Sequence, residues 1–130
     1  MSDAVPPEAE RLLTGEPVAA HLATCTDGRP HVAPLWFHYA DGVVELVTTG
    51  RKLENLRENP HVSLSAQRAD GGIPEWTVTL LGTATVVDDE AATREANHRI
   101  NRRYGVPEDA WEDENTLVRV EVGSASYRTY

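Results

Sequence analysis

Two Asp-Gly dipeptides separate three short runs of alternating apolar and polar residues in the first half of the chain. Asp27-Gly28 lies between residues 18–24 and 30–39, and Asp41-Gly42 lies between residues 30–39 and 43–48. Asp-Gly is typical of two-residue hairpin turns, because both residues tolerate the positive φ that such a turn requires. The segment therefore predicts three antiparallel strands joined by two tight turns, which is a β-meander.

The second half of the chain predicts further strands. Residues 61–66 and 75–87 alternate on either side of the turn Asp70-Gly71-Gly72, and residues 116–122 form the last strand. In the long run 75–87 the threonines fall on one face and the aliphatic residues on the other. Gly82, in the middle of this run, predicts a bend or a close backbone approach of the kind found at barrel corners.

Three segments show helical patterns, and each ends at a residue that stops a helix. The segments are 5–14, 51–58 and 88–104. Gly15 and Gly105 suit helix C-termini, and the residue before Pro60 avoids the helical conformation. Short helices among six or so antiparallel strands, without regular βαβ alternation, favour a mainly β chain with a small barrel over a doubly wound sheet. We expect one domain spanning residues 1–130.

Charge and cysteine content argue against several classes of protein. The chain has 12 Lys and Arg against 21 Asp and Glu, a formal net charge of −9, which disfavours binding to nucleic acid or to anionic membranes. No apolar run approaches the length of about 20 residues that spans a bilayer. The first eight residues lack the basic and apolar regions of a signal peptide, and the single cysteine, Cys25, forms no internal disulfide. We therefore expect a cytoplasmic protein.

The histidines and the cysteine form no recognised catalytic or metal-binding motif. None of the five histidines forms a His-x-x-x-His pair on a helix, and none has a neighbouring cysteine. A catalytic thiol at Cys25 would need a histidine and an activating environment. We therefore assign no metal ligand and no catalytic acid, base or nucleophile.

The junction between the third strand and the following helix has the chemistry of an anion site. Two hydroxyl residues, Thr48 and Thr49, precede a glycine, and Arg51 and Lys52 then begin the helix. Helix N-termini carry free N–H groups and partial positive charge, which bind phosphate. Asn55 follows Lys52 by one turn on the same face, and Lys52 is the only lysine of this acidic chain. A capped helix with solvated cations is the alternative interpretation.

Three motifs together carry a family resemblance. They are Asp27-Gly28-Arg29-Pro30, Pro34-Leu35-Trp36-Phe37 and Thr48-Thr49-x-Arg51-Lys52-x-x-Asn55-Leu56-x-x-Asn59-Pro60-x-Val62-Ser63. The chain resembles the pyridoxamine 5'-phosphate oxidase-like flavoproteins over residues 15–90. The resemblance implies a split β-barrel that holds FMN at a homodimer interface. The chain is much shorter than the vitamin B6 oxidase and its end lacks a clear counterpart of the pyridoxal-phosphate pocket, so that enzyme's reaction is not implied.

The resemblance also assigns roles to individual residues. The second strand would lie against the isoalloxazine ring through Val32, Pro34, Leu35 and Trp36. The ribityl phosphate would be held by Thr48, Thr49, Arg51, Lys52 and Asn55. The neighbouring subunit would complete the site from its long strand, through Trp76 and Thr77. His31 and His38 flank the ring-binding strand, so a role near the ring is open for both.

These expectations lead to an FMN-dependent oxidoreductase with an unidentified small-molecule substrate. A flavin carries out hydride transfer itself, so the absence of a catalytic motif is compatible with this function. The close alternative is a reductase using the deazaflavin coenzyme F420, whose anionic oligoglutamate tail favours a basic groove. Two further alternatives are a non-catalytic protein that binds a flavin or haem, and a structural barrel that binds no cofactor. Trp111, in an acidic segment, either covers a partner's pocket or anchors its loop on its own barrel.

Overall fold

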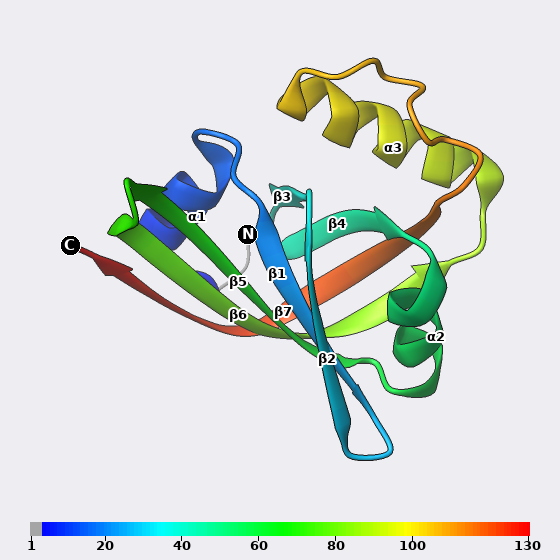
Figure 1. Cartoon of the computed structure of the whole chain (residues 1–130), viewed down its shortest axis with the longest axis horizontal. Coiled ribbons are helices and arrows are strands. Elements are labelled where there is room, and N and C mark those ends of the chain that lie inside the picture. The colour runs from blue at the N-terminus through cyan, green and yellow to red at the C-terminus, as the bar shows by residue number, and fades with distance from the viewer. Residues whose placement is uncertain (1–3) are drawn as a thin grey trace.

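One antiparallel sheet of seven strands curls into an open barrel in the computed structural model, which describes residues 4–130 (Figure 1). The strands are β1 Ala20–Thr26, β2 Arg29–Leu35, β3 His38–Ala40, β4 Val43–Thr48, β5 His61–Asp70, β6 Ile73–Val87 and β7 Thr116–Thr129. The helices are α1 Pro7–Thr14, α2 Gly50–Glu58 and α3 Glu90–Tyr104. Residues 1–3 lie outside the described residues. They belong to the segment that we expect not to be a signal peptide.

The strand order β2-β1-β5-β6-β7-β4-β3 leaves β2 and β3 at the two edges of the sheet. This confirms the mainly β fold class and the split-barrel architecture. Both Asp-Gly turns are confirmed as well, because Asp27 and Gly28 have φ of 52° and 73°, and Asp41 and Gly42 have φ of 48° and 79°. Each turn closes a hairpin, β1–β2 in the first case and β3–β4 in the second.

The predicted β-meander is wrong, because the return strand expected over residues 30–39 breaks after Leu35. β2 pairs with β1, whereas β3 pairs with β4 at the opposite edge of the sheet. At the break Phe37 is buried in the core and its backbone N–H donates to the Tyr104 hydroxyl over 3.3 Å. The chain thereby crosses the open side of the barrel, and residues 34–37 come to lie beneath α3.

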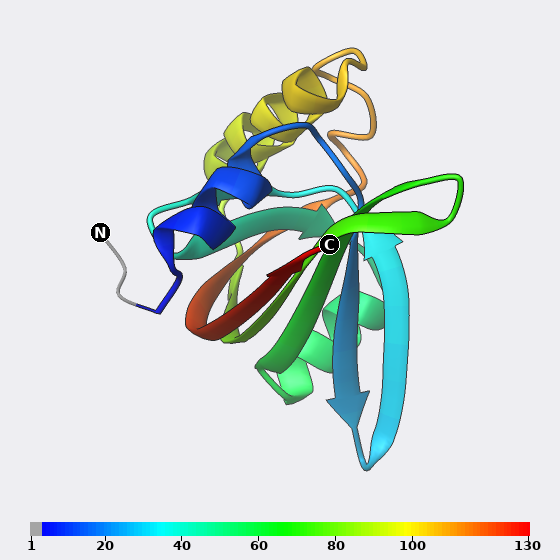
Figure 2. The same ribbon diagram turned by 90° about the vertical axis from the view of Figure 1, so that its left-hand side faces the viewer.

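The two faces of the sheet differ as the alternation of β6 predicted. Val78, Leu80 and Ala84 are buried, whereas Thr79 and Thr83 are exposed. The inner face forms the core together with α1, which buries one side of its helix against the barrel. In Figures 1 and 2 α3 lies above α2, and the ion pair between Arg57 and Asp88 links the last turn of α2 to the residues just before α3.

Gly82 marks the corner where β6 bends. A Cβ atom there would lie 2.5 Å from the Glu121 carbonyl oxygen and 2.7 Å from Cγ1 of Val120, which confirms the predicted close approach. The register of β6 on β7 also shifts between Leu81 and Gly82. β7 does not end near residue 122 as expected but continues along β6 to Thr129.

Candidate functional site

The start of α2 is a helix end that no side chain caps. Thr49 occupies the N-cap position with extended backbone, yet its side chain makes no capping hydrogen bond, and the first turn holds no acidic residue. Gly50 has φ of +71° and allows the sharp change from β4 into the helix. The first N–H groups of α2 therefore remain available to an anion, as at other helix N-termini.

Arg51 and Lys52 add positive charge to this helix start in different ways. Arg51 is exposed and forms a loose ion pair with Glu54, with 3.7 Å between Nε and Oε2. Lys52 is half-buried, and within residues 4–130 it forms no ion pair. An ammonium group beside free helix N–H groups and without a counter-charge favours an anionic ligand. Lys52 is therefore the strongest phosphate-binding candidate of the predicted set.

Asn55 and Thr48 are engaged within the protein. The Asn55 amide is buried, donates to the Thr24 hydroxyl over 3.1 Å, and accepts from the Thr26 hydroxyl over 3.0 Å. These bonds fasten α2 to β1. Thr48 is buried at the end of β4, where its hydroxyl lies 3.4 Å from the Thr49 carbonyl oxygen. The contact of Asn55 and Thr48 with a phosphate remains a prediction.

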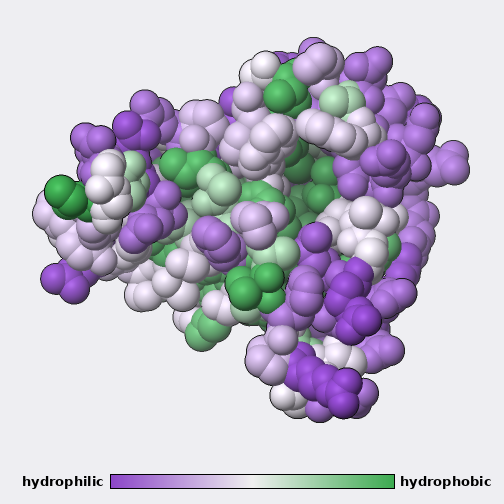
Figure 3. Space-filling model, in the orientation of Figure 1, coloured by the Kyte–Doolittle hydropathy of each residue, from purple (hydrophilic) through white to green (hydrophobic). Residues whose placement is uncertain are grey.

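An apolar pocket of about 290 Å³ lies beside the predicted ring-binding strand. It is lined by Pro34, Leu35, Trp36, Val47, Ile100, Asn101, Trp111 and Asn115, none of them charged. Val47 directly precedes Thr48, so the structure brings the predicted ring-binding residues next to the start of the predicted phosphate site. The hollow below α3 exposes apolar side chains on the molecular surface (Figure 3).

Three aromatic rings form one cluster at this pocket. Trp36 stacks on Tyr104 with ring centroids 4.7 Å apart and planes 8° apart, and Trp111 meets Trp36 edge-on at 6.0 Å. The Tyr104 hydroxyl donates to the Val18 carbonyl over 2.7 Å, and burial raises the pKa of this phenol, so the ring is neutral and fixed. No sequence motif marks Tyr104, because it is simply the last residue of α3.

The loop that carries Trp111 is clamped to α3. The Asn101 amide donates to the carbonyls of Pro107, Glu108 and Ala110, and the Asn97 amide donates to the last two as well. On the other side of Trp111, the Glu112 carboxylate accepts a hydrogen bond from His98 Nε2 over 2.6 Å. Within one chain Trp111 packs edge-on against Trp36 of its own barrel, and a role as a cover over a partner's pocket stays a prediction.

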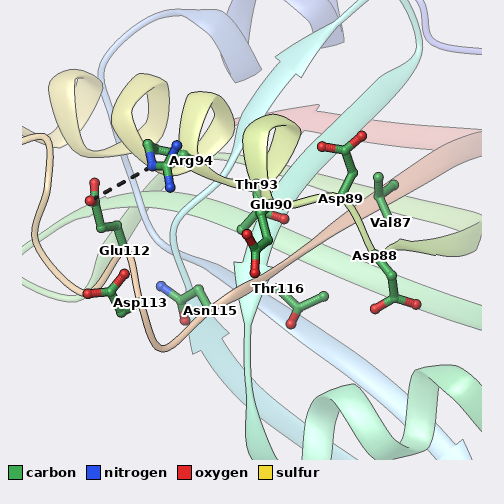
Figure 4. A pocket seen from close by; sticks show the side chains of 10 residues that line it. All are labelled: Val87, Asp88, Asp89, Glu90, Thr93, Arg94, Glu112, Asp113, Asn115 and Thr116. Carbon is green, nitrogen blue, oxygen red and sulfur yellow. Dashed lines mark ion pairs between the residues drawn. The ribbon is translucent and has the colours of Figure 1, made fainter.

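An acidic groove of about 470 Å³ adjoins the apolar pocket, and Asn115 lines both (Figure 4). Its carboxylates belong to Asp88, Asp89, Glu90, Glu112 and Asp113, and its one cation is Arg94. Arg94 forms an ion pair with Glu112, and a hydrogen bond from Arg57 lowers the pKa of Asp88. With these two pairings, the remaining carboxylates still leave the lining of the groove with a net negative charge.

Outside the predicted phosphate site, three predicted cofactor residues, Val32, Trp76 and Thr77, do not line the pocket within one chain. Val32 is on the outer face of β2 and is 63% exposed, whereas Trp76 is buried in the core. The Thr77 hydroxyl lies 3.5 Å from that of Tyr130. Thr77 does not line the pocket, and its place in a site that contains the pocket remains a prediction.

The two histidines near the ring-binding strand do not line the apolar pocket. His31 faces a separate groove with Arg29 and Arg51. His38 Nδ1 lies 3.7 Å from Glu45, and burial, followed by the charge of Arg99, lowers its pKa. Residues 4–130 contain no group of three or more His, Cys, Asp or Glu placed to hold a metal ion.

The outer face of the sheet carries two rows of residues without a carboxylate, lysine or arginine. The cross-strand register aligns Pro34, His21, Ser65, Thr79 and Ser126 in one row, and Val32, Ala23, Ser63, Leu81 and Ser124 in the next. Leu81 is 55% exposed there. We refer to these ten residues as the outer rows. Weakly polar and apolar surface also crosses the middle of the molecule between more hydrophilic regions in Figure 3.

The curled antiparallel sheet, with its uncapped helix after β4, defines a split β-barrel. A model of the pyridoxamine 5'-phosphate oxidase family matches residues 6–129, and the chain belongs to this family. A search of curated proteins finds no match. Within residues 4–130, no helix combines the length and apolar character needed to cross a membrane.

Solved structures with this fold bind different cofactors. An F420 reductase is 27% identical to the chain, with a TM-score of 0.77 over 93% of this chain and 98% of that one. A FAD-binding protein from Mesorhizobium loti is 23% identical, with a TM-score of 0.77 over 100% and 96%. The heme storage protein HutZ from Vibrio cholerae is 20% identical, with a TM-score of 0.75 over 96% and 94%. At these lower identities the last two share the fold alone.

Proposed function

We propose that this chain is an FMN-dependent oxidoreductase that acts on a small molecule as a cytoplasmic homodimer. The observation that carries the proposal is Lys52, a half-buried lysine without an ion-pair partner in residues 4–130, at the start of a helix that no side chain caps. A phosphate is the ligand that this combination of free N–H groups and charge suits best. Pro34 and Leu35, at the β2 edge of the adjoining uncharged pocket, would lie against the flat ring of the cofactor.

In this proposal the protein supplies binding and orientation. Bound FMN would supply hydride transfer. Lys52, the N–H groups of α2, and the hydroxyls of Thr48 and Thr49 would hold its phosphate. The apolar side chains of Pro34 and Leu35 would exclude water from the ring, which strengthens electrostatic interactions at the reacting atoms.

The test of the phosphate assignment is Lys52→Ala. We expect FMN binding to weaken by roughly 1–3 kcal/mol, the scale of a lost charge-assisted hydrogen bond. Quenching of FMN fluorescence on titration with protein measures the affinity. Lys52→Arg keeps the charge and serves as the matched control, with most of the affinity retained. Equal affinity of the alanine variant and the parent would refute the assignment.

We propose a second copy of the chain as the partner, with its Thr77 completing the site, as the family resemblance implies. The outer rows suit such an interface, since charged residues are depleted at interface cores. We expect Leu81→Arg to convert a dimer into a monomer in analytical ultracentrifugation. Ile73→Arg is the control, because Ile73 is 72% exposed at the β5–β6 turn, outside the outer rows. Monomeric parent protein would contradict the proposal.

The second candidate cofactor is the deazaflavin coenzyme F420, which the 27% identity to an F420 reductase favours. The acidic groove beside the pocket argues against its anionic tail, since like charges in proximity cost binding energy. Direct competition between FMN and F420 for the purified protein separates the two. Flavin that binds but is never reduced by nicotinamide donors or by reduced F420 would instead indicate a carrier or storage protein.

A further inference from the structure

We propose that the pocket between Trp36 and Trp111 binds a flat aromatic part of the substrate, and that the adjoining acidic groove discriminates against substrates that carry negative charge. This inference rests on the proposed function, because it names the substrate class of that same site. It concerns residues on the α3 side of the pocket, away from the predicted phosphate site at α2.

The lining of the pocket selects for an uncharged, apolar group. Charged residues make up 25% of the chain, yet none lines this pocket. Of its two polar residues, Asn101 already donates its amide to loop carbonyls, and Asn115 donates to Asn97 over 3.1 Å. Ligand sites of this composition bind mainly by burying apolar surface.

The aromatic cluster selects for a flat ring as this apolar group. Stacking on Tyr104 and the hydrogen bond from Tyr104 to Val18 fix the orientation of Trp36. Trp111 meets Trp36 at 71°, so the two indoles form walls at an angle to each other. Aromatic rings pair best in stacked or edge-on arrangements, and a flat ligand at these walls can make both kinds of contact.

Trp111 is held in a conformation that packing alone does not explain. It has φ of +59° although it is a bulky residue, and 54% of it remains exposed. Bulky residues with positive φ are strained, and such strain concentrates at functional sites. The clamps on either side of it, from Asn101 to Ala110 and from His98 to Glu112, hold the exposed indole at the pocket.

The charge preference follows from the groove next to Asn115. Five carboxylates and one guanidinium line this groove, and two of the carboxylates, Glu112 and Asp113, directly follow Trp111 in the chain. Figure 4 shows them on the side of the groove opposite Asp88 and Asp89. At an ionic strength of 0.1 M such charges act over about 10 Å, so they repel an anionic substituent on a ring in the pocket.

The test uses three compounds with the same ring and different charge: 2-naphthylmethanol, 2-naphthylmethylammonium and 2-naphthoate. Isothermal titration of the FMN-loaded protein at low ionic strength measures their dissociation constants. We expect the neutral and cationic compounds to bind at least about fivefold more tightly than the anion. Asp113→Asn combined with Glu90→Gln should narrow this difference. An anion that binds as tightly as the other two would overturn the charge preference.

Trp111→Ala tests the aromatic wall. We expect it to weaken binding of 2-naphthylmethanol by about fivefold or more, the scale of one lost aromatic contact, and Trp111→Phe to restore most of the affinity. The FMN dissociation constant should change by less than about twofold, which a general folding defect would not allow. A variant that loses FMN and the naphthyl compound equally would make Trp111 a cofactor contact and overturn the inference.

The two proposals fail in distinguishable ways. Should the protein not bind FMN, the titrations are run on the protein as purified. Binding of the naphthyl compounds that still depends on Trp111 and on charge would then support the pocket while the proposed function fails. If FMN binds but saturating FMN displaces 2-naphthylmethanol, the pocket belongs to the cofactor and the inference is wrong.

Discussion

The helices α2 and α3 each follow a strand of the same sheet, β4 and β6, but their N-terminal backbone groups are satisfied in opposite ways. At α3 the Asp89 side chain accepts from the Ala92 N–H over 2.9 Å, and Gly105 closes the helix in the left-handed conformation. At α2 the N-cap residue Thr49 makes no such bond, and Lys52 in the first turn forms no ion pair within residues 4–130. The ends of α3 are capped within the protein, whereas the start of α2 keeps N–H donors and a positive charge that no side chain in residues 4–130 pairs with.

The difference separates scaffold from candidate binding site. Polar groups that are satisfied inside the protein make a rigid wall, because every movement would break hydrogen bonds. Donors that no side chain satisfies bind water or a ligand. The α3 side therefore positions the pocket and its aromatic rings, and the start of α2 offers charge to an anion. Three changes, taken from the largest expected effect to the smallest, test this contrast.

The largest effect should come from removing the clamp between α3 and its loop. Asn101 is 3% exposed and donates to three loop carbonyls. Asn101→Ala leaves these acceptors without that donor, which we expect to lower the free energy of unfolding by about 2–3 kcal/mol. Urea denaturation measures the loss, and acrylamide quenching of tryptophan fluorescence should rise as the Trp111 loop loosens.

Glu95→Ala is the control for this change, because Glu95 is an exposed residue of the same helix. Its effect should stay within about 0.5 kcal/mol. An Asn101→Ala protein as stable as Glu95→Ala would contradict the contrast, because the hydrogen bonds between α3 and its loop would then add no measurable stability.

A smaller effect should appear at a second internally satisfied group, the Tyr39 hydroxyl. It donates to Glu10 over 2.6 Å and accepts from the Gly42 N–H over 2.9 Å. Tyr39→Phe should cost about 1–2 kcal/mol at neutral pH. Burial and the hydrogen bond to Glu10 raise the pKa of Tyr39 to about 12. The phenol ionises near pH 10 in the unfolded chain.

The raised pKa gives this contact a defined pH dependence. Below pH 10 the phenol is neutral in the folded and the unfolded state, so its hydrogen bonds contribute their full stabilisation. Between about pH 10 and 12 the unfolded state loses its proton first, so stability falls with rising pH. The parent should therefore lose stability more steeply than Tyr39→Phe across this range. Tyr127→Phe, at an exposed tyrosine, is the control and should follow the parent; parallel pH curves for the parent and Tyr39→Phe would contradict the assignment.

The turns and helix ends near α2 and α3 could be predicted from the sequence wherever neighbouring residues determine the backbone conformation. Asp-Gly set both hairpin turns, Gly105 set the end of α3, and Thr49-Gly50-Arg51-Lys52 set the start of α2. Gly82 predicted the corner of β6, because only a residue without a side chain fits against Glu121. In each case one or two residues determine the backbone, so the signal is local.

The rest depends on contacts between distant residues. The break between β2 and β3 is fixed by the bond from Phe37 to Tyr104, which lie 67 positions apart, and the run 30–39 gives no local reason to stop. The second half of β7 has little apolar alternation, and β6 holds it through backbone pairing. The aromatic pocket likewise combines residues of β2, α3 and the loop, so no motif in the sequence could define it.

The smallest and sharpest test makes the start of α2 resemble that of α3. Thr49 already has the extended backbone of an N-cap, so Thr49→Asp should supply the missing acceptor and stabilise the protein by about 0.5–1 kcal/mol. The same change should weaken FMN binding, because it occupies the free N–H groups and adds a negative charge. Thr49→Asn caps without charge, so its smaller loss of affinity separates competition for donors from repulsion. A Thr49→Asp protein that gains stability and keeps its full affinity for FMN would show that the phosphate does not bind at this helix end.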